Sequence, residues 1–287
     1  TEIYTLSLHD ALPISVSGKV FDEKELLNAV DAILEGWWTE GKYNELFENG
    51  LKHFLGCNHS ITVNSGSSAN LIAVSALKSH LLSKEKRLHA GDEIITVASS
   101  FPTTINPIIQ NNLNPVFVDV ELETYNINPN LILDAISEKT KAIFVAHTMG
   151  NPIDIDACLK IAHDHNLWFI EDNCDSLGAE YNQKKTGCFG DIATQSFYPA
   201  HHITTAEGGA LITEDNQLKK IIVSIRDWGR DCWCKTGCDN TCNNRYGWKL
   251  GDLPEGYDHK YIYSHIGYNL KMTDIQAAIG LAQLEKL

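Results

Sequence analysis

Short apolar runs alternate along the chain with longer segments whose apolar residues recur every three or four positions. Residues 23–34 carry Leu26, Leu27 and Val30 at helical spacing, and residues 43–55 repeat the pattern. We predict strands at 61–63, 93–98, 115–120, 141–147, 167–171, 192–194 and 210–213, with helices at 68–81, 103–111, 129–136, 153–165 and 274–287. Strands separated by helices need right-handed crossovers, so the pattern indicates an α/β fold with a mostly parallel sheet flanked by helices.

Two parts of the chain fall outside this alternation. Residues 227–260 show no periodicity, are rich in Cys, Asn, Gly and Asp, and are too long for a plain connection, which predicts an insertion or functional loop. Residues 1–15 resemble translated adaptor sequence, so the predicted domain covers residues 16–287. The last helical pattern shows no stop signal, and we expect the chain to be a fragment cut at both ends.

Composition narrows the class of protein. The 287 residues carry a formal net charge of −14, which argues against nucleic acid as the main partner. No apolar run approaches the roughly 20 residues of a membrane-spanning helix. Eight cysteines without a secretory signal indicate thiols kept reduced, so we expect a cytoplasmic protein.

A run of small polar residues stands between the first predicted strand and the helix that follows it. Gly66, Ser67 and Ser68 let a ligand approach the backbone, and the first N–H groups of a helix attract anions, most naturally a phosphate. An ordinary serine cap of the helix is the alternative interpretation.

Two further side chains follow predicted strands. Asp172 stands where a carboxylate would hold a protonated ring nitrogen by a charge-assisted hydrogen bond, or would cap a turn. Phe101 follows another strand, where a flat ring would stack on a cofactor or pack in the core. Taken alone, Phe101 at this position is predicted to pack in the core.

The loop between the last two predicted strands, residues 196–209, offers two adjacent imidazoles, His201 and His202, with hydroxyl groups on both sides. A histidine near its ordinary pKa gives or takes a proton at neutral pH. The alternative is a pair of surface histidines.

Taken together and in this order, these motifs resemble the fold-type I enzymes that bind pyridoxal phosphate, and more narrowly the DegT/DnrJ/StrS sugar aminotransferase family. Phe197, residues 207–209 and residues 267–278 fit that family as well, and the resemblance covers residues 17–287. It implies the large domain of that fold, without its C-terminal small domain. It also implies roles for individual residues: Gly66, Ser67, Ser68 and Ser196 at the cofactor phosphate, Asp172 at the pyridine nitrogen, Phe101 on the ring, and Asn269 at the phosphate of a partner subunit in a homodimer.

One departure from the family pattern points to the reaction. In the family, a lysine that binds the cofactor covalently stands five residues after the serine that corresponds to Ser196. This chain has His201 at that position. Histidine can still act as a base, but it has no primary amine that could act as a nucleophile. The resemblance is then to the lysine-free sugar 3-dehydratases of the family, which use pyridoxamine phosphate and remove a hydroxyl group, with His201 as the base.

The cysteines resemble those of the iron–sulfur members of this subgroup. The implied ligands of a [2Fe–2S] cluster are Cys174, Cys232, Cys234 and Cys242, and the fold is expected to bring Cys174 against the loop that carries the other three. Without the resemblance, the four thiols would favour zinc. Cys238 is a spare thiol in the same loop, and Cys57, Cys158 and Cys188 are predicted to be buried or incidental.

The resemblance implies removal of the C3 hydroxyl from a CDP-linked 4-keto-6-deoxyhexose in lipopolysaccharide sugar biosynthesis. The implied partner is an NADH-dependent iron–sulfur flavoprotein reductase. A cluster-free enzyme acting on GDP-4-keto-6-deoxymannose, and a binding module without turnover, are the alternatives.

Overall fold

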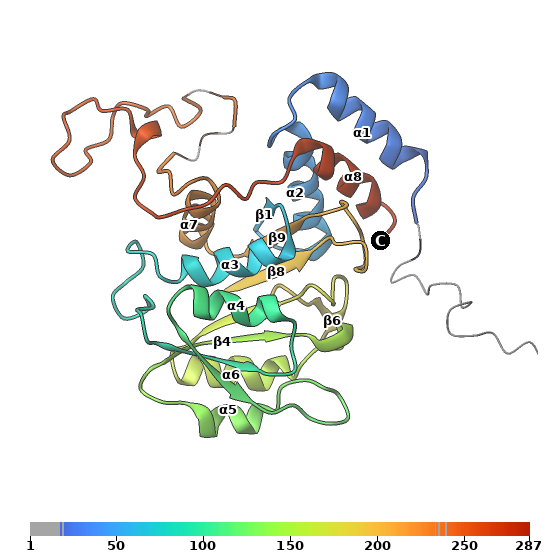
Figure 1. The fold of residues 1–287 in the computed structure, drawn as a ribbon, viewed down its shortest axis with the longest axis vertical. Helices are drawn as coiled ribbons and strands as arrows, with labels where there is room; N and C mark the ends of the chain where they lie inside the picture. The colour runs from blue at the N-terminus through green and yellow to red at the C-terminus, as the bar shows by residue number, and fades with distance from the viewer. Residues whose placement is uncertain (1–17, 19, 233, 235, 239) are drawn as a thin grey trace, which may run out of the picture.

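The computed structural model describes residue 18 and residues 20–232, 234, 236–238 and 240–287. The adaptor-like residues 1–15 lie outside this range. The described chain forms a central sheet with helices on both faces, and the segment between α7 and α8 leaves this body as a long arm (Figure 1). We call residues 227–270 the arm.

Seven strands of the described chain form the main sheet, in the order β1-β9-β8-β5-β4-β2-β3. Strands β8, β5, β4, β2 and β3 run parallel, whereas β9 pairs antiparallel with both β8 and β1, so that β1 is an edge strand. The strands are β1 (His59–Val63), β2 (Glu93–Val97), β3 (Asn114–Val118), β4 (Thr140–Ala146), β5 (Trp168–Asp172), β8 (Ile192–Ser196) and β9 (Gly209–Thr213), and a separate hairpin is formed by β6 (Glu180–Tyr181) and β7 (Lys184–Lys185).

The helices cover the sheet because each buries an apolar stripe. Their bounds are α1 (Glu23–Glu35), α2 (Lys42–Leu55), α3 (Gly66–Ala76), α4 (Pro102–Gln110), α5 (Pro129–Ala135), α6 (Ile155–Asp164), α7 (Asn216–Arg226) and α8 (Asp274–Leu284), with 3₁₀ turns η1 (Thr148–Gly150) and η2 (His259–Tyr261). Helices α3 and α7 share one core cluster with residues of β1, β2, β4, β5, β8 and β9. Helices α5 and α6 cover the other face at β2 to β5, and α2 and α8 cover that face at β8 and β9. Helix α1 packs on α8.

The predicted elements are confirmed as elements, with shifted ends. The helix predicted at 68–81 begins at Gly66, where Ser65 caps it, and ends at Ala76. Helix α7 was not predicted, although Leu218, Ile221 and Ile225 give it a helical stripe. No helix in the described part of the chain is long and apolar enough to cross a membrane.

Candidate cofactor site at the carboxyl ends of the strands

The first turn of α3 faces the end of β8. Ser65 accepts a hydrogen bond from the Ser68 amide at 3.0 Å and so caps the helix. A Cβ atom at Gly66 would lie 2.5 Å from Cβ of Ser196, so the absence of a side chain lets the two segments meet. Residues 66 to 68 and Ser196 therefore come together from distant parts of the chain, with Ser67 exposed. The N-terminus of α3 and these hydroxyls form a cradle that suits a phosphate.

Asp172 is the last residue of β5 and is held from two other elements. Its Oδ2 atom accepts hydrogen bonds from Nδ2 of Asn70 at 3.0 Å and from Oγ1 of Thr104 at 2.7 Å, and Oδ1 accepts one from the Cys174 amide at 3.2 Å. The carboxylate is buried, with 5% of the residue exposed. Three donors in a buried place fix its direction, which is what a carboxylate needs in order to receive a ring N–H.

His201 lies in the loop between β8 and β9, against the loop that follows β5. Its Nδ1 atom lies 3.2 Å from Oδ1 of Asp175. This contact, ahead of an opposing effect of burial, lowers the pKa of Asp175. Nδ1 is therefore the ring nitrogen that a neighbouring carboxylate holds. His202 is exposed, and burial of part of its ring, together with His201, lowers its pKa.

Phe101 occupies the N-cap position of α4, where its side chain makes no cap hydrogen bond, and is 70% exposed. This exposure rules out the core position that the sequence favoured for the residue taken alone. The residue directly follows Ser100, whose buried Oγ atom has no hydrogen-bond partner among the described residues. An exposed ring and a buried unpaired hydroxyl at the same strand end suit a site that receives a partly polar ring.

Asn269 lies at the end of the arm and is exposed. It pairs with Asp227 across the base of the arm, and its Oδ1 atom accepts a hydrogen bond from Nζ of Lys271 at 2.7 Å. The neighbouring Leu270 carbonyl accepts from the Asn64 amide at 2.9 Å, just before α3. The residue is therefore fixed near the first turn of α3 and presents its side chain at the surface.

Three of the four cysteines of the arm, Cys232, Cys234 and Cys242, form one group. Burial raises the pKa of Cys234, but hydrogen bonds from Thr241, Cys242 and Cys232 outweigh it and lower the pKa to about 7. Sγ of Cys242 also lies 3.8 Å from Nε2 of His259. Within the described residues, however, no three Cys, His, Asp or Glu side chains are arranged to hold a metal ion.

Cys174 is at a different place. Burial and the neighbouring Asp172 raise the pKa of its thiol well above the ordinary value, and its other neighbours are Asp175 and Thr194. The sequence led us to expect Cys174 against the arm, and the fold of one chain does not bring them together. The four thiols of a single chain therefore do not fit a [2Fe–2S] cluster as they stand.

The remaining four cysteines lie outside the implied ligand set. Cys57, Cys158 and Cys188 are buried, and the thiols of Cys57 and Cys188 hydrogen-bond to each other. Cys238 is exposed and lines a cavity with Cys234.

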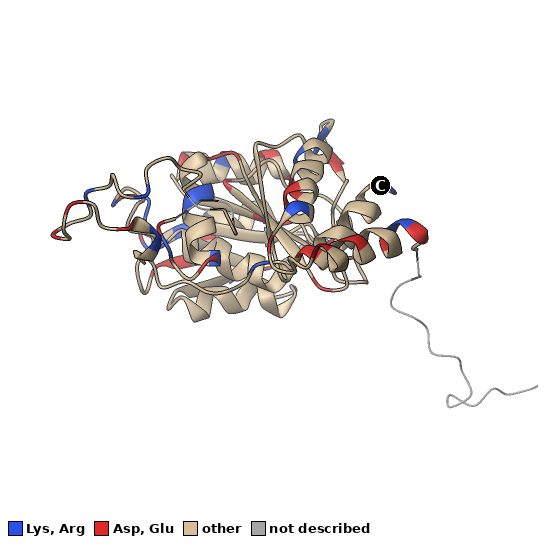
Figure 2. Cartoon of the chain, turned by 90° about the horizontal axis from the view of Figure 1, so that it is seen from above, with Lys and Arg blue, Asp and Glu red and all other residues tan. Residues whose placement is uncertain are grey.

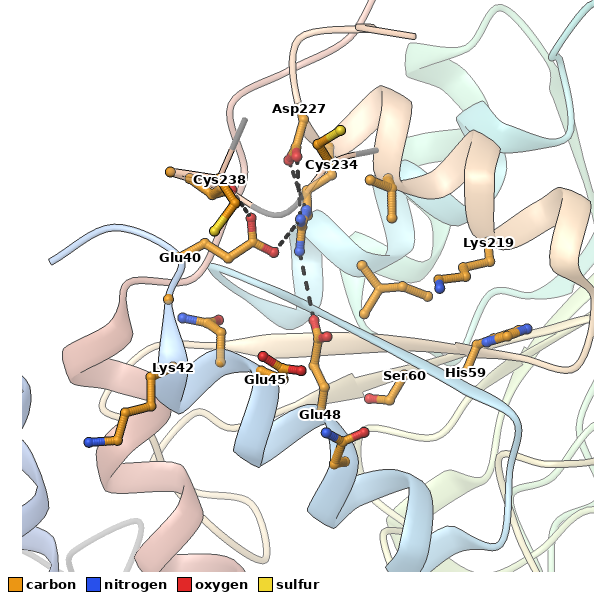
Figure 3. A pocket seen from close by; sticks show the side chains of 18 of the residues that line it. Glu40, Lys42, Glu45, Glu48, His59, Ser60, Lys219, Asp227, Cys234 and Cys238 are labelled. Atoms are coloured by element: carbon orange, nitrogen blue, oxygen red, sulfur yellow. Dashed lines mark hydrogen bonds and ion pairs between the residues drawn. The ribbon is translucent and has the colours of Figure 1, made fainter. Parts of the chain in front are cut away.

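That cavity, of about 630 Å³, lies at the outer edge of β1 between α2, α7 and the arm. Figure 3 shows Glu40, Glu48 and Asp227 pointing toward one another, and each is joined to the buried side chain of Arg226. Arg226 also donates to the Thr62 carbonyl at 3.1 Å. The arrangement is a structural charge cluster that ties the base of the arm to α2 and β1.

Sequence reasoning missed the residues that orient the site. Asn70, Thr104 and Asp175 act on Asp172 and His201 from other elements, and no local pattern marks them.

In the sequence, Glu171 stands out only as the last residue of the strand predicted at 167–171. Its buried carboxylate accepts hydrogen bonds from the Gly187, Phe189 and Gly190 amides and from the ring of His147. These bonds organise the loop at 187–190 next to the strand that carries Asp172.

Solved structures with the same arrangement define the class. The chain superposes on an Escherichia coli GDP-4-keto-6-deoxy-D-mannose-3-dehydratase with bound hydrated PLP, with a TM-score of 0.81 and 33% identity, over 94% of this chain and 67% of the other. A second structure of a GDP-4-keto-6-deoxymannose-3-dehydratase, with a trapped PLP–glutamate geminal diamine, gives 0.83 and 32%, over 96% and 68%. The fold is thus the large α/β domain of the fold-type I pyridoxal-phosphate enzymes.

Residues 20–287 match the DegT/DnrJ/EryC1/StrS aminotransferase family, and the chain belongs to that family. Among similar proteins, the lipopolysaccharide biosynthesis protein RfbH of Salmonella typhimurium is 59% identical, over 94% of this chain and 62% of the relative. The dTDP-4-dehydro-2,6-dideoxy-D-glucose 3-dehydratase of Saccharopolyspora spinosa is 54% identical, over 96% and 59%. The chain thus spans about 60% of the length of these two relatives.

Proposed function

We propose that the full-length protein removes the C3 hydroxyl group of a nucleotide-linked 4-keto-6-deoxyhexose, with CDP as the nucleotide. The observation that carries this proposal is the contact between Nδ1 of His201 and Asp175, in the loop after β8 where the resemblance puts the family's lysine. A base without a nucleophilic amine suits proton removal and does not suit covalent attachment of the cofactor. The names of the relatives, which include 3-dehydratases of dTDP- and GDP-linked sugars, support the reaction class.

The residues at the strand ends fit pyridoxamine phosphate. Gly66, Ser67, Ser68 and Ser196 would hold its phosphate, Asp172 its ring nitrogen, and Phe101 the face of its ring. When bound, the cofactor supplies a primary amine that condenses with the C4 ketone and a ring that accepts electrons. In this site Asp172 would keep the ring nitrogen protonated, and Nε2 of His201 would take the proton from the C4′ carbon.

The reaction needs an outside source of electrons. Replacing the C3 hydroxyl by hydrogen releases water and consumes two electrons and two protons. We propose an NADH-dependent iron–sulfur flavoprotein reductase as the donor, and Cys174, Cys232, Cys234 and Cys242 as ligands of one [2Fe–2S] centre. The thiolate chemistry of these residues supports that centre, whereas the geometry of one chain does not assemble it. We also propose a homodimer, with Asn269 directed to the partner's site.

The test is turnover by the full-length protein after anaerobic reconstitution with iron, sulfide and pyridoxamine phosphate. CDP-4-keto-6-deoxyglucose with NADH and the reductase should give a 3-deoxy sugar, followed by mass spectrometry. Omission of the reductase should stop product formation. Amino-sugar product, or no reaction with any nucleotide-linked 4-keto-6-deoxyhexose, would overturn the proposal.

A cluster-free dehydratase acting on GDP-4-keto-6-deoxymannose is the second candidate. It is favoured by the similarity to the solved GDP-linked enzymes and by the lack of a metal-ready group in the described residues. This candidate would regenerate the cofactor amine from glutamate. Turnover of the GDP sugar with glutamate, without iron and without reductase, would select it.

A further inference from the structure

The strand order separates Cys174 from the other three thiols. Cys174 stands two residues beyond β5, and strands β8 and β9 lie between β5 and the edge strand β1. Neighbouring strands are about 4.8 Å apart, so β5 and β1 are about 14 Å apart. Cys234 lies beyond β1, because it lines the cavity at the outer edge of that strand with His59 and Ile61. A two-iron centre needs all its sulfur ligands within bonding reach, and these positions do not allow it.

The base of the arm is held by backbone hydrogen bonds, so a swing of the arm within the same chain does not close this distance. The Trp228 amide donates to the Tyr268 carbonyl across the base at 2.6 Å, and the Asp231 amide donates to the Ile262 carbonyl at 2.9 Å. Cys232 directly follows this paired segment and is itself buried. The first arm cysteine is therefore tied to the position of the base.

A side chain also anchors the second half of the arm, which leads back to α8, to the body. The ring of His265 lies between two serines, with Nε2 at 2.7 Å from Oγ of Ser79 and Nδ1 at 3.0 Å from Oγ of Ser224. These serines belong to the segment after α3 and to α7, so the arm is fastened to two parts of the body at once.

The arm carries large side chains that its own chain leaves uncovered. It extends away from the body in both views, and Figure 1 places β6, which follows Cys174 in sequence, on the opposite side of the body (Figures 1 and 2). Its exposed large side chains include aromatic and aliphatic ones: Tyr246 58%, Tyr257 38%, Tyr261 60%, Tyr263 54% and Ile266 96%. Exposed tyrosines on a projecting segment are typical of a surface that packs on another protein.

We propose that the cluster is built between two copies of this chain. Each centre takes Cys232, Cys234 and Cys242 from the arm of one subunit and Cys174 from the other subunit. The second copy is the occupant that the arm fits, because it carries the one thiol that the arm's own chain holds out of reach. This inference rests on the proposed iron–sulfur function, and it makes the dimer a requirement for the cluster.

The test uses two kinds of mixed dimer of the full-length protein, made by co-expression of differently tagged chains and tandem purification. The first pairs a Cys174→Ser chain with a Cys232→Ser chain. If the cluster is shared, one of the two sites has all four thiols, so iron, sulfide and visible absorbance should be about half the wild-type values. If each chain holds its own cluster, this dimer should contain none.

The second mixed dimer pairs a wild-type chain with a chain that carries both substitutions, and its expected result is reversed. A shared cluster leaves both sites incomplete and should give no cluster, whereas a cluster within one chain should give half. Retained binding of pyridoxamine phosphate by each dimer shows that the chains are folded. Half-loading of the second dimer and none of the first would overturn the shared cluster alone. A wild-type dimer without iron would overturn the proposed cluster itself, and this inference with it.

Discussion

His201 has a defined orientation because a second side chain holds one of its ring nitrogens. The contact between Nδ1 and Asp175 comes from the loop after β5, while His201 itself comes from the loop after β8. Loops after two different strands therefore set the direction of one imidazole.

Replacing His201 by Asn should remove the base and leave the cofactor site intact. We expect exchange of the C4′ hydrogen of bound pyridoxamine phosphate with solvent to fall by at least about 100-fold, since a general base contributes about that much. Exchange is measured by NMR in deuterated buffer, and cofactor affinity by titration. His202→Asn is the matched control and should exchange normally. Full exchange in His201→Asn would move the base elsewhere.

At the scale of the elements, Arg226, the last residue of α7, holds several segments together. It bonds Asp227 at the base of the arm, Glu40 before α2, Glu48 within α2 and the Thr62 carbonyl of β1. Burial lowers the pKa of this guanidinium, but the three carboxylates outweigh burial and raise it, so the side chain stays charged.

Arg226→Met should therefore destabilise the protein by about 3–5 kcal/mol, because it leaves the buried carboxylate of Asp227 and the half-buried carboxylates of Glu40 and Glu48 without their partner. The measurement is the midpoint of urea unfolding. Lys219→Met, on the same helix and lining the same cavity, is the control and should change stability by less than about 0.5 kcal/mol, because Lys219 is exposed. Equal midpoints for the two variants would contradict this role for Arg226.

Across the whole molecule, the buried pair of Glu171 and His147 links β4, β5 and the loop at 187–190. Their atoms Oε2 and Nε2 are 3.1 Å apart, and neither side chain is exposed. Nδ1 of His147 accepts a hydrogen bond from the Ile153 amide. Nε2 therefore carries the hydrogen and donates a hydrogen bond to the Glu171 carboxylate. Burial raises the pKa of Glu171, but His147 and the Gly190 and Gly187 amides outweigh burial and lower it.

This lowered pKa has a direct consequence for stability. The contribution of Glu171 is fully present above its unfolded pKa of about 4.3 and is lost as pH falls through the lower folded value. Glu171→Gln should therefore be less stable than wild type at pH 7, and the difference should narrow below about pH 4. Urea unfolding across this pH range measures it. Glu123→Gln, at an exposed position, should match wild type throughout, and a difference for Glu171→Gln that stays constant with pH would contradict the assignment.

Local sequence was enough to predict the elements of this protein and the residues at their ends. Apolar runs marked the buried strands β4 and β5, and the serines and glycine at 65–68 marked the first turn of α3, because periodicity and capping act within a few residues. The same local patterns placed Asp172 and His201 at strand ends.

Contacts between elements could be seen only in the folded chain. Asn70 and Thr104 reach Asp172, and Asp175 reaches His201, through packing between elements far apart in sequence. The cysteines show the limit most clearly. The family resemblance implied one group, yet strand order places Cys174 three strands from the edge where the arm lies. Strand order depends on the packing of the whole sheet, and no window of sequence contains it.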